Sequence, residues 1–315
     1  FGSSSSDRCA ITPDYLFRLR LLLLPALVTA MSTQSLILAW AVAVGPAGCS
    51  AKLLLKMNGA ASVSLRESFD FIDEPAEQWA LRKQVHLAQM QREAKLGLTQ
   101  GGSNGAGWWQ YHHEPSFHCE LEERLGNTGD GGKWVCDPYS IKRGIDAGKP
   151  CLVYSVGSHG QFDFEQSVQD SISPKCEVHI FDPATVGTWS IPANMSYHAF
   201  PLGTGTDLVQ GVLTKSIGDI VNELGHKGRM VDIFKIDCEG CEWETYQQWL
   251  TSGIEIRQIL VELHWRNDPK KANELFNFLY DNGYVVFNKE SNTEGCKGEC
   301  IEYAFLKLDP QFSKA

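Results

Sequence analysis

The feature that most constrains the fold is an alternation of strand-like and helix-like segments from Cys151 almost to the C-terminus. Short apolar runs alternate with longer segments of helical spacing, which predicts an α/β fold with a parallel sheet covered on both faces. The expected strands are 151–156, 176–181, 196–200, 230–236, 256–263, 284–288 and 301–308. The expected helices are 161–171, 215–224, 243–250 and 269–282. Because no helix separates the last two strands, they should form an antiparallel hairpin.

The part of the chain before this alternation divides into two further regions. Residues 1–58 are expected to be a signal peptide or signal anchor, and residues 59–107 a peripheral region. In the peripheral region, 74–96 is rich in helix-forming residues, and 99–107 is a Gly-rich linker. Residues 108–315 then form the main domain, which opens with an aromatic block that is expected to pack on a sheet edge.

In an open α/β sheet, ligands bind at the carboxyl ends of the strands. The first expected strand ends in a glycine turn at 155–160, which exposes backbone N–H groups to a polar or anionic ligand. The second strand ends in Asp182, where a carboxylate accepts hydrogen bonds from a ribose in dinucleotide-binding sheets. The third ends near Gly203, where the backbone can approach a flat ring. These strand ends predict a site for a nucleotide-like ligand.

The fourth and fifth strand ends carry further polar groups. Asp237, Glu239 and Glu242 follow the fourth strand, and Glu262 and His264 end the fifth. Each could simply cap a turn or a helix. Their occurrence at successive strand ends favours a single ligand site.

These segments resemble a family of enzymes. The run 231–242, preceded by 213–221, is similar to the corresponding part of FkbM-type S-adenosylmethionine-dependent methyltransferases. The wider run resembles a methyltransferase-domain family that includes methyltransferase-like protein 24, and its markers are 131–138, 153–157, 164–165 and 181–183. The resemblance covers about 108–308. It implies a Rossmann-like seven-stranded sheet of order 3-2-1-4-5-7-6, with S-adenosylmethionine as the methyl donor.

Carried onto this chain, the resemblance implies roles for individual residues. Gly157 and Gly160 would let the backbone approach the methionine part of the donor, while Asp182 would hold its ribose. Asp237 and Glu239 would line the transfer site. The common glycine loop reads Asp/Glu-x-Gly-x-Gly-x-Gly, and this chain departs from it at Ser155, His159 and Gln161. The residues expected to contact the donor are Ser155, Gly157, Gly160, Glu165, Asp182, Gly203 and Asp237.

Methyl transfer also requires a base if the acceptor is an oxygen or a protonated nitrogen. The candidates are Asp237, Glu239 and His264, with His159 behind them. A carboxylate partly withdrawn from water at a strand end is expected to have its pKa raised toward neutrality. No metal is expected. The alternative hypothesis, motivated by the unusual glycine loop, is a catalytically inactive lumenal binding module.

Net charge and cysteine content indicate which kinds of acceptor and which cellular compartment to expect. A formal net charge of −10 argues against bulk nucleic acid, so the acceptor is expected to be a small molecule, a glycan or a protein. Ten cysteines favour an oxidising compartment, and Cys119 with Cys136 is the expected disulfide. Cys238-x-x-Cys241 and Cys296-x-x-x-Cys300 resemble halves of a zinc site, but a disulfide between the two pairs, or free thiols, is favoured.

The N-terminal region contains a long uncharged stretch, 21–51, preceded by Arg18 and Arg20. It is long enough for a single membrane anchor with the rest of the chain outside the cytosol. If translation starts at Met31, the apolar block 36–44 instead fits a cleaved signal peptide. A buried helix is the third interpretation. Secretory targeting is expected, with cytoplasmic location as the alternative, and an N-glycosylation sequon at 194–196 agrees with it.

Overall fold

The computed structural model describes residues 42–44, 50–52, 64–68, 71–183, 190–309 and 312, with the backbone alone for 42–44, 50–52 and 64–67. The chain separates into two compact units, Phe1–Ala60 and Ala61–Ala315. In the first unit, strands β1 (Val42–Val44) and β2 (Ser50–Lys52) pair antiparallel. The rest of the expected targeting segment lies outside the described residues. Within the described part of the chain, no helix is long and apolar enough to cross a membrane.

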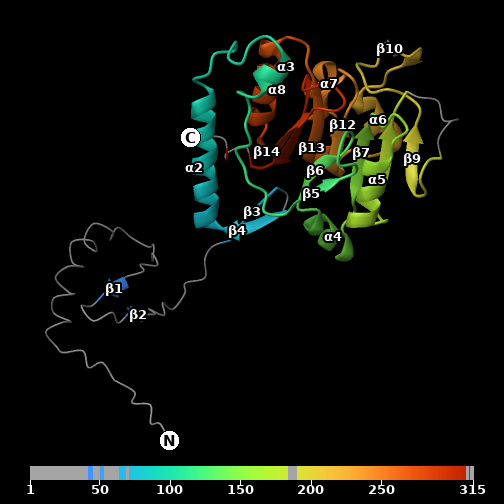
Figure 1. The fold of residues 1–315 in the computed structure, drawn as a ribbon. Helices are drawn as coiled ribbons and strands as arrows, with labels where there is room; N and C mark the ends of the chain where they lie inside the picture. Colours follow the sequence, from blue (N-terminus) through green and yellow to red (C-terminus); the bar gives the residue numbers. More distant parts are fainter. Residues whose placement is uncertain are drawn as a thin grey trace, which may run out of the picture. The chain divides into compact units, whose positions relative to one another are not determined.

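The second unit is built on a seven-stranded sheet of order β14-β15-β13-β12-β7-β8-β9 (Figure 1). Its strands are β7 (Leu152–Val156), β8 (Glu177–Phe181), β9 (Met195–His198), β12 (Met230–Ile236), β13 (Glu255–His264), β14 (Tyr284–Asn292) and β15 (Cys300–Lys307). Strands β9, β8, β7, β12 and β13 run parallel, whereas β15 is antiparallel to both β13 and β14. Counted along the chain, this order is 3-2-1-4-5-7-6. The predicted α/β class, strand order and terminal hairpin are confirmed.

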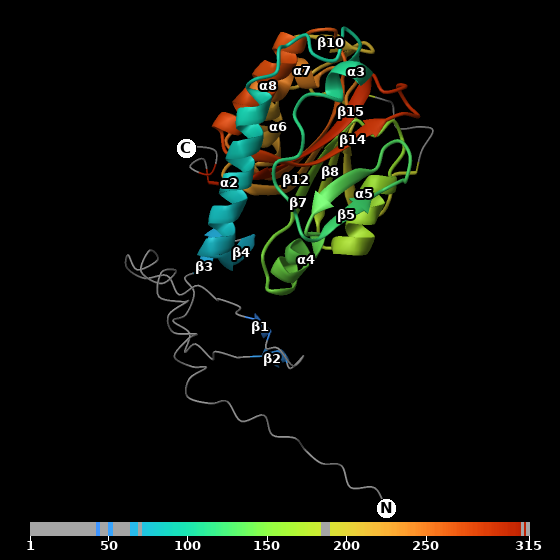
Figure 2. The ribbon, with the colours of Figure 1, turned by 60° about the vertical axis from the view of Figure 1, so that its left-hand side comes forward.

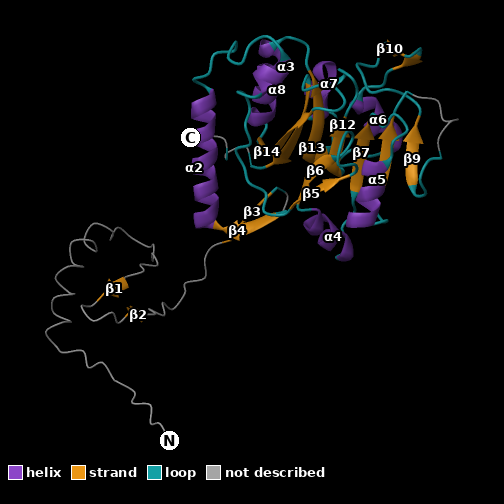
Figure 3. Ribbon diagram, viewed as in Figure 1, coloured by secondary structure: helices purple, strands orange, loops and turns teal. Residues whose placement is uncertain are grey.

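Helices cover both faces of this sheet (Figure 3). One core lies against α6 (Ile217–Leu224), α7 (Glu242–Trp249) and α8 (Pro269–Asp281), and the other against α4 (Pro138–Asp146) and α5 (Asp163–Ser167). Successive strand residues alternate between these cores, as Ile233 and Phe234 do. Burial on both faces explains why the strands are nearly continuous apolar runs. The expected helix over 161–171 is α5 followed by a π-helical turn at Val168–Ile172.

Smaller elements surround the sheet. The expected peripheral helix is α2 (Ala76–Glu93), which follows a hairpin of β3 (Ser64–Glu67) and β4 (Ile72–Pro75) and lies beside α8 (Figure 2). A short helix, α3 (Gly105–Trp109), begins inside the expected Gly-rich linker. Two further hairpins had not been predicted, β5 (Glu122–Leu125) with β6 (Lys133–Cys136) and β10 (Leu208–Val209) with β11 (Val212–Leu213).

The aromatic block at the start of the main domain is buried. Trp108 and Trp109 of α3 are almost completely excluded from solvent. The ring centroid of Trp109 lies 5.8 Å from that of Tyr303 on β15. The block therefore packs against the sheet, as expected.

Four disulfides join described cysteines. Cys119–Cys136 is present as expected, and Cys151–Cys176, which had not been predicted, joins the starts of β7 and β8. Cys238 bonds Cys241 and Cys296 bonds Cys300, so the expected disulfide between these two pairs is wrong. The reason is the sheet order: β13 lies between the end of β12 and the start of β15. Two strand spacings are about 9.6 Å, beyond the roughly 7 Å that a disulfide can bridge between Cα atoms.

Replacing both Cys151 and Cys176 with alanine should lower the free energy of unfolding by about 3 kcal/mol, because the bond closes a loop between residues 25 positions apart. Urea denaturation without reductant measures the loss. The matched control is Cys238→Ala with Cys241→Ala, which opens a loop with a separation of only 3 and should lose less. Equal midpoints for the wild type and the Cys151/Cys176 variant would contradict the expectation.

Candidate active site

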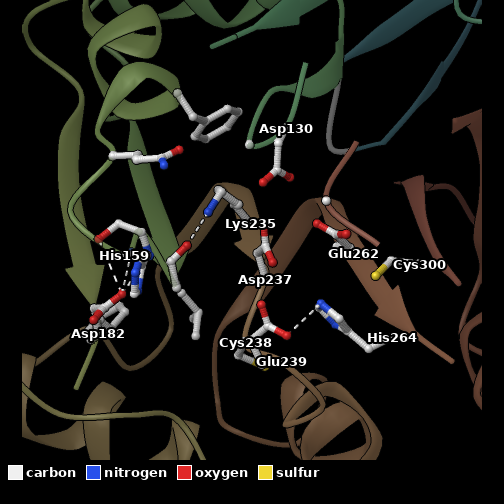
Figure 4. Close-up of a pocket in the computed structure, with 18 of the residues that line it drawn as sticks. Asp130, His159, Asp182, Lys235, Asp237, Cys238, Glu239, Glu262, His264 and Cys300 are labelled. Atoms are coloured by element: carbon white, nitrogen blue, oxygen red, sulfur yellow. Dashed lines mark hydrogen bonds and ion pairs between the residues drawn. The ribbon is translucent and has the colours of Figure 1, made fainter. Parts of the chain in front are cut away.

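A cleft of about 390 Å³ opens at the carboxyl ends of β7, β8, β12 and β13. Figure 4 shows Asp182 and His159 at one end and Glu262 and His264 at the other, with Asp237 between them. The cleft volume lies within the range of small-molecule sites in proteins. The sheet therefore brings the polar groups of successive strand ends to one place, as the sequence predicted.

The glycine turn after β7 passes very close to the end of β12. Gly157 has a φ of +75°, and a Cβ at this position would lie 1.6 Å from the carbonyl oxygen of Asp237. Only glycine can adopt this φ without strain and without collision. The turn is fixed further by Lys235, whose Nζ donates to the Gly157 carbonyl oxygen at 2.6 Å. Gly157 thus lets two strand ends meet at the floor of the cleft.

Asp182 holds the other side of the same turn. Its Oδ2 accepts from the backbone N–H of Ser158 at 2.8 Å and from that of His159 at 2.7 Å. Asp182 is only 4% exposed and lines the cleft together with Phe181 and Leu202. A buried carboxylate and apolar walls form this end of the cleft, which suits a nucleoside. The expectation that the turn exposes its backbone N–H groups to a ligand is wrong, because those of residues 157–161 all donate to acceptors within the protein.

Beneath the turn, Ser155 donates its hydroxyl proton to Glu165, and both side chains are fully buried. The second carboxylate oxygen of Glu165, Oε2, has no hydrogen-bond partner among the described residues. Glu165 therefore brings a carboxylate to the serine that replaces the acidic residue of the common loop. Ser155, Gly160, Glu165 and Gly203 do not line the cleft in the described structure, although all four had been expected to contact the donor.

At the opposite end of the cleft, a buried lysine had been missed by sequence reasoning. Lys133, on β6, is 2% exposed. Its Nζ lies 2.5 Å from Glu302, 3.1 Å from Asp237 and 3.7 Å from Glu262. Glu262 and Glu302 are direct partners in the antiparallel pairing of β13 with β15. One ammonium group therefore joins three strands through their carboxylates.

This arrangement gives the carboxyl groups of Asp237 and Glu262 very different pKa values. Burial tends to raise the pKa of Asp237, but the ammonium groups of Lys133 and Lys235 hold it at about 2. Burial, together with the charges of Asp237 and Glu302, raises the pKa of Glu262 to about 9. At neutral pH, Asp237 is ionised and Glu262 is protonated. The expected rise in pKa is thus wrong for Asp237, because its two lysine partners outweigh the effect of burial.

His264 is held by a buried carboxylate. Oε1 of Glu242, at the start of α7, accepts from the backbone N–H of His264 at 2.9 Å and from its Nδ1 at 3.1 Å. Nε2 of His264 lies 3.4 Å from Oε2 of Glu239, whose side chain is 88% exposed. Burial would lower the pKa of His264, but the hydrogen bond to Glu242 and the nearby carboxylates raise it to about 9. The predicted trio Asp237, Glu239 and His264 does line one cleft.

Several groups of this site had no role in the sequence prediction. Glu262 had been noted at a strand end but not selected, whereas Lys133 lies within the 131–138 marker without having been recognised. Asn292, at the end of β14, donates through Nδ2 to Asp130 at 2.8 Å and to Glu262 at 2.9 Å. Asn292 lies in the hairpin of β14 and β15. A pattern of alternating strands and helices does not predict which residues of such a hairpin reach the cleft.

Comparison with known proteins identifies the family. A family model described as "Methyltransferase domain" matches residues 62–307. The chain belongs to this methyltransferase-domain family. The match covers most of the chain and begins ahead of α2. No curated protein matches the sequence.

The solved structures to which the chain is similar include methyltransferases. A ribosomal RNA methylase described as putative, from Clostridium thermocellum, has 10% identity and a TM-score of 0.32, covering 50% of this chain and 87% of that chain. The Burkholderia thailandensis 1,6-didemethyltoxoflavin-N1-methyltransferase, solved with bound 1,6-didemethyltoxoflavin and S-adenosylhomocysteine, has 11% identity and a TM-score of 0.32, covering 55% of this chain and 78% of that chain. A ribosomal RNA methylase from Streptococcus thermophilus has 8% identity and a TM-score of 0.30, covering 51% and 88%.

Lys133→Met should lower the free energy of unfolding by about 3–5 kcal/mol at pH 7, because buried carboxylates lose their counter-ion. Urea denaturation measures the loss, and Lys142→Met, which removes an exposed lysine of α4, is the control. Since the folded-state pKa of Asp237 is about 2, its stabilising contribution is present above pH ~4 and is lost as the pH falls toward 2.

The difference between the wild type and Lys133→Met should therefore shrink below pH 4. A loss no larger than that of Lys142→Met at pH 7, or one that stays constant down to pH 3, would contradict this account of the cluster.

Proposed function

We propose that this protein transfers a methyl group from S-adenosylmethionine to an oxygen or nitrogen of an acceptor. The observation that carries the proposal is the joining of the glycine turn and Asp182 with Asp237 and His264 in one cleft. Membership in the methyltransferase-domain family supports it. The donor supplies an electrophilic methyl group on a sulfonium. The protein therefore has to bind the donor and the acceptor, align them, and remove a proton from the acceptor.

The donor would lie at the end of the cleft formed by the glycine turn. Asp182 would bind the ribose hydroxyls, and Phe181 and Leu202 provide apolar surface for the adenine. The turn at Gly157 and Ser158 would face the methionine part.

The acceptor would lie between Asp237 and His264. Asp237 is ionised and would accept a hydrogen bond from the acceptor, which orients it toward the methyl group. His264, fixed by Glu242, would remove the acceptor proton through Nε2 once its own proton has been released to Glu239 or to water. This assignment rests on the different pKa values in the cleft. Asp237 is ionised at neutral pH, whereas His264 has a pKa of about 9 and releases its proton at mildly alkaline pH.

The lining of the cleft also restricts the acceptor. It carries Asp130, Asp163, Asp237 and Glu239 in addition to Asp182, and these outnumber its two cations, Lys235 and the protonated His264. Negative charge attracts the cationic donor and disfavours phosphate-rich acceptors. We therefore propose a glycan, a small molecule or a protein side chain rather than bulk nucleic acid. We also propose that the chain is related to FkbM-type enzymes and to the family that includes methyltransferase-like protein 24.

Asp182→Asn should weaken the binding of S-adenosylmethionine, because an amide replaces the ionised acceptor of ribose hydrogen bonds. A roughly tenfold increase in Kd corresponds to the loss of one charge-assisted hydrogen bond. Calorimetry on residues 61–315 and on the full chain measures it, with Asp146→Asn on the surface of α4 as the control. Unchanged affinity in Asp182→Asn would place the ribose elsewhere, and no binding by the wild type would overturn the proposal.

His264→Gln should lower kcat by about 10²–10⁴-fold, because it removes the proposed base. In the wild type, kcat should rise from pH 7 to about 9, since the pKa of His264 is about 9 and only its neutral form accepts a proton. The variant should lose this dependence. Incorporation of labelled methyl into pooled glycans, metabolites and proteins is the readout.

A flat pH profile in the wild type would instead indicate Asp237 as the base. Binding of the donor without any incorporation would support the inactive binding module.

We also propose a secretory location, with the N-terminal segment as a signal peptide or a single membrane anchor. Four disulfides among the described cysteines support an oxidising compartment. Asn194 is exposed in the turn before β9 and is accessible to glycosylation.

Expressed in animal cells with its N-terminal segment intact, the protein should lose mass on treatment with an N-glycosidase, and Asn194→Gln should abolish that shift. Mass mapping of the unreduced protein provides a second readout, because it shows whether the Cys119 and Cys136 peptides are joined by a disulfide. Free thiols at both positions together with no glycan would contradict the secretory proposal.

A further inference from the structure

A second group of polar side chains lies away from the cleft, at the other end of the parallel strands. Glu177 starts β8, His179 follows two residues later on the same face, and His226 comes just after α6. One ligand atom from each lies within 4.8 Å of the others. His179 and His226 are 6% and 4% exposed, whereas the side chain of Glu177 is 42% exposed. None of the three is among the described residues that line the cleft.

The distances between these atoms suit one small divalent ion. Oε1 of Glu177 lies 2.9 Å from Nε2 of His179 and 3.2 Å from Nε2 of His226. Tetrahedral zinc with bonds of about 2.0–2.1 Å separates its ligand atoms by about 3.3 Å. Shifts of a few tenths of an ångström therefore bring the two carboxylate–imidazole distances to this value, and the two imidazole nitrogens lie within 4.8 Å of each other. Two imidazoles and one carboxylate are a ligand set that zinc takes in proteins, with water in the fourth position.

Each of the three ligands has a partner that fixes its orientation. Nδ1 of His226 lies 2.6 Å from the hydroxyl oxygen of Tyr154, and Nδ1 of His179 lies 2.9 Å from Nε2 of His198. Arg229 donates to Oε2 of Glu177 at 2.7 Å, which leaves Oε1 directed at the imidazoles. In metal sites the second ring nitrogen of a ligating histidine and the outer oxygen of a carboxylate are held in this way. The cluster therefore has a set of supporting contacts as well as the ligands.

Two other three-residue groups among the described residues do not meet these conditions. Cys300, which lies near Glu262 and His264, is bonded to Cys296 and has no thiolate to offer. The carboxylates Asp237, Glu262 and Glu302 already surround the ammonium group of Lys133. In the cluster of Glu177, His179 and His226, the neighbouring cation Arg229 binds Oε2 of Glu177, so that Oε1 remains directed at the two imidazoles.

We propose that Glu177, His179 and His226 form a zinc-binding site that joins the start of β8 to the segment after α6. The site is structural, since its ligands lie outside the cleft. The half-exposed Glu177 gives the ion access from solvent. This inference does not depend on the proposed methyl transfer.

The test measures bound zinc in the full chain, with its disulfides kept oxidised so that cysteine thiolates do not bind the metal. After incubation with zinc and dialysis against metal-free buffer, mass spectrometry of the wild type should give about one zinc per chain. Glu177→Gln and His226→Gln should retain less than about a tenth of this. His118→Ala, an exposed histidine outside the cluster, should keep the full amount.

A second measurement guards against loss of zinc through misfolding. Glu177→Gln alters a half-exposed side chain and should keep the circular dichroism spectrum of the wild type. Added zinc should raise the Tm of the wild type and of His118→Ala but leave that of Glu177→Gln unchanged. A wild type that retains no zinc and shows no shift in Tm, or a Glu177→Gln variant that binds as much as the wild type, would mean that the cluster is a hydrogen-bond network only.

Discussion

The contact on which the candidate site depends is the ammonium group of Lys133 among three carboxylates. Asp237, Glu262 and Glu302 come from three neighbouring strands, and without a cation between them their charges would repel at close range. Lys133 comes from a hairpin outside the sheet, so it also attaches that hairpin to the strand ends. The side chain of Gln258 on β13 adds to this attachment through hydrogen bonds to both the N–H and the carbonyl of Cys136, at 2.8 Å each.

The same contact sets the protonation states of the carboxyl groups in the cleft. Lys133 keeps Asp237 ionised in a place where burial alone would favour its neutral form, while Glu262 takes up the proton. A few residues away, Glu242 holds His264 as a cation that can lose its proton at mildly alkaline pH. Adjacent ionisable groups thereby hold different protonation states because of their surroundings. At the other end of the cleft, Gly157 allows the glycine turn to approach the end of β12 closely, which brings Asp182 and Asp237 into one cleft.

The sequence predicted the parallel sheet because its strands are buried on both faces and so appear as uninterrupted apolar runs. It also predicted Asp182, Asp237 and His264, since parallel strands bring their carboxyl ends to one edge. Lys133 and Glu302 could not be found in this way. Lys133 lies on an unpredicted hairpin, and Glu302 lies near the start of an antiparallel strand, which shares that edge only because the strand runs backwards. The pKa of Asp237 was misjudged for the same reason, because its principal partner was not yet known.

The central claim is that one cleft holds the donor at Asp182 and the acceptor chemistry at Asp237 and His264. A crystal structure with S-adenosylhomocysteine tests it most directly. The account predicts the ribose hydroxyls on Asp182, the adenine against Phe181 and Leu202, and the sulfur directed toward Asp237 and His264. A ligand bound elsewhere, or bound with its sulfur turned away from these two residues, would contradict the account.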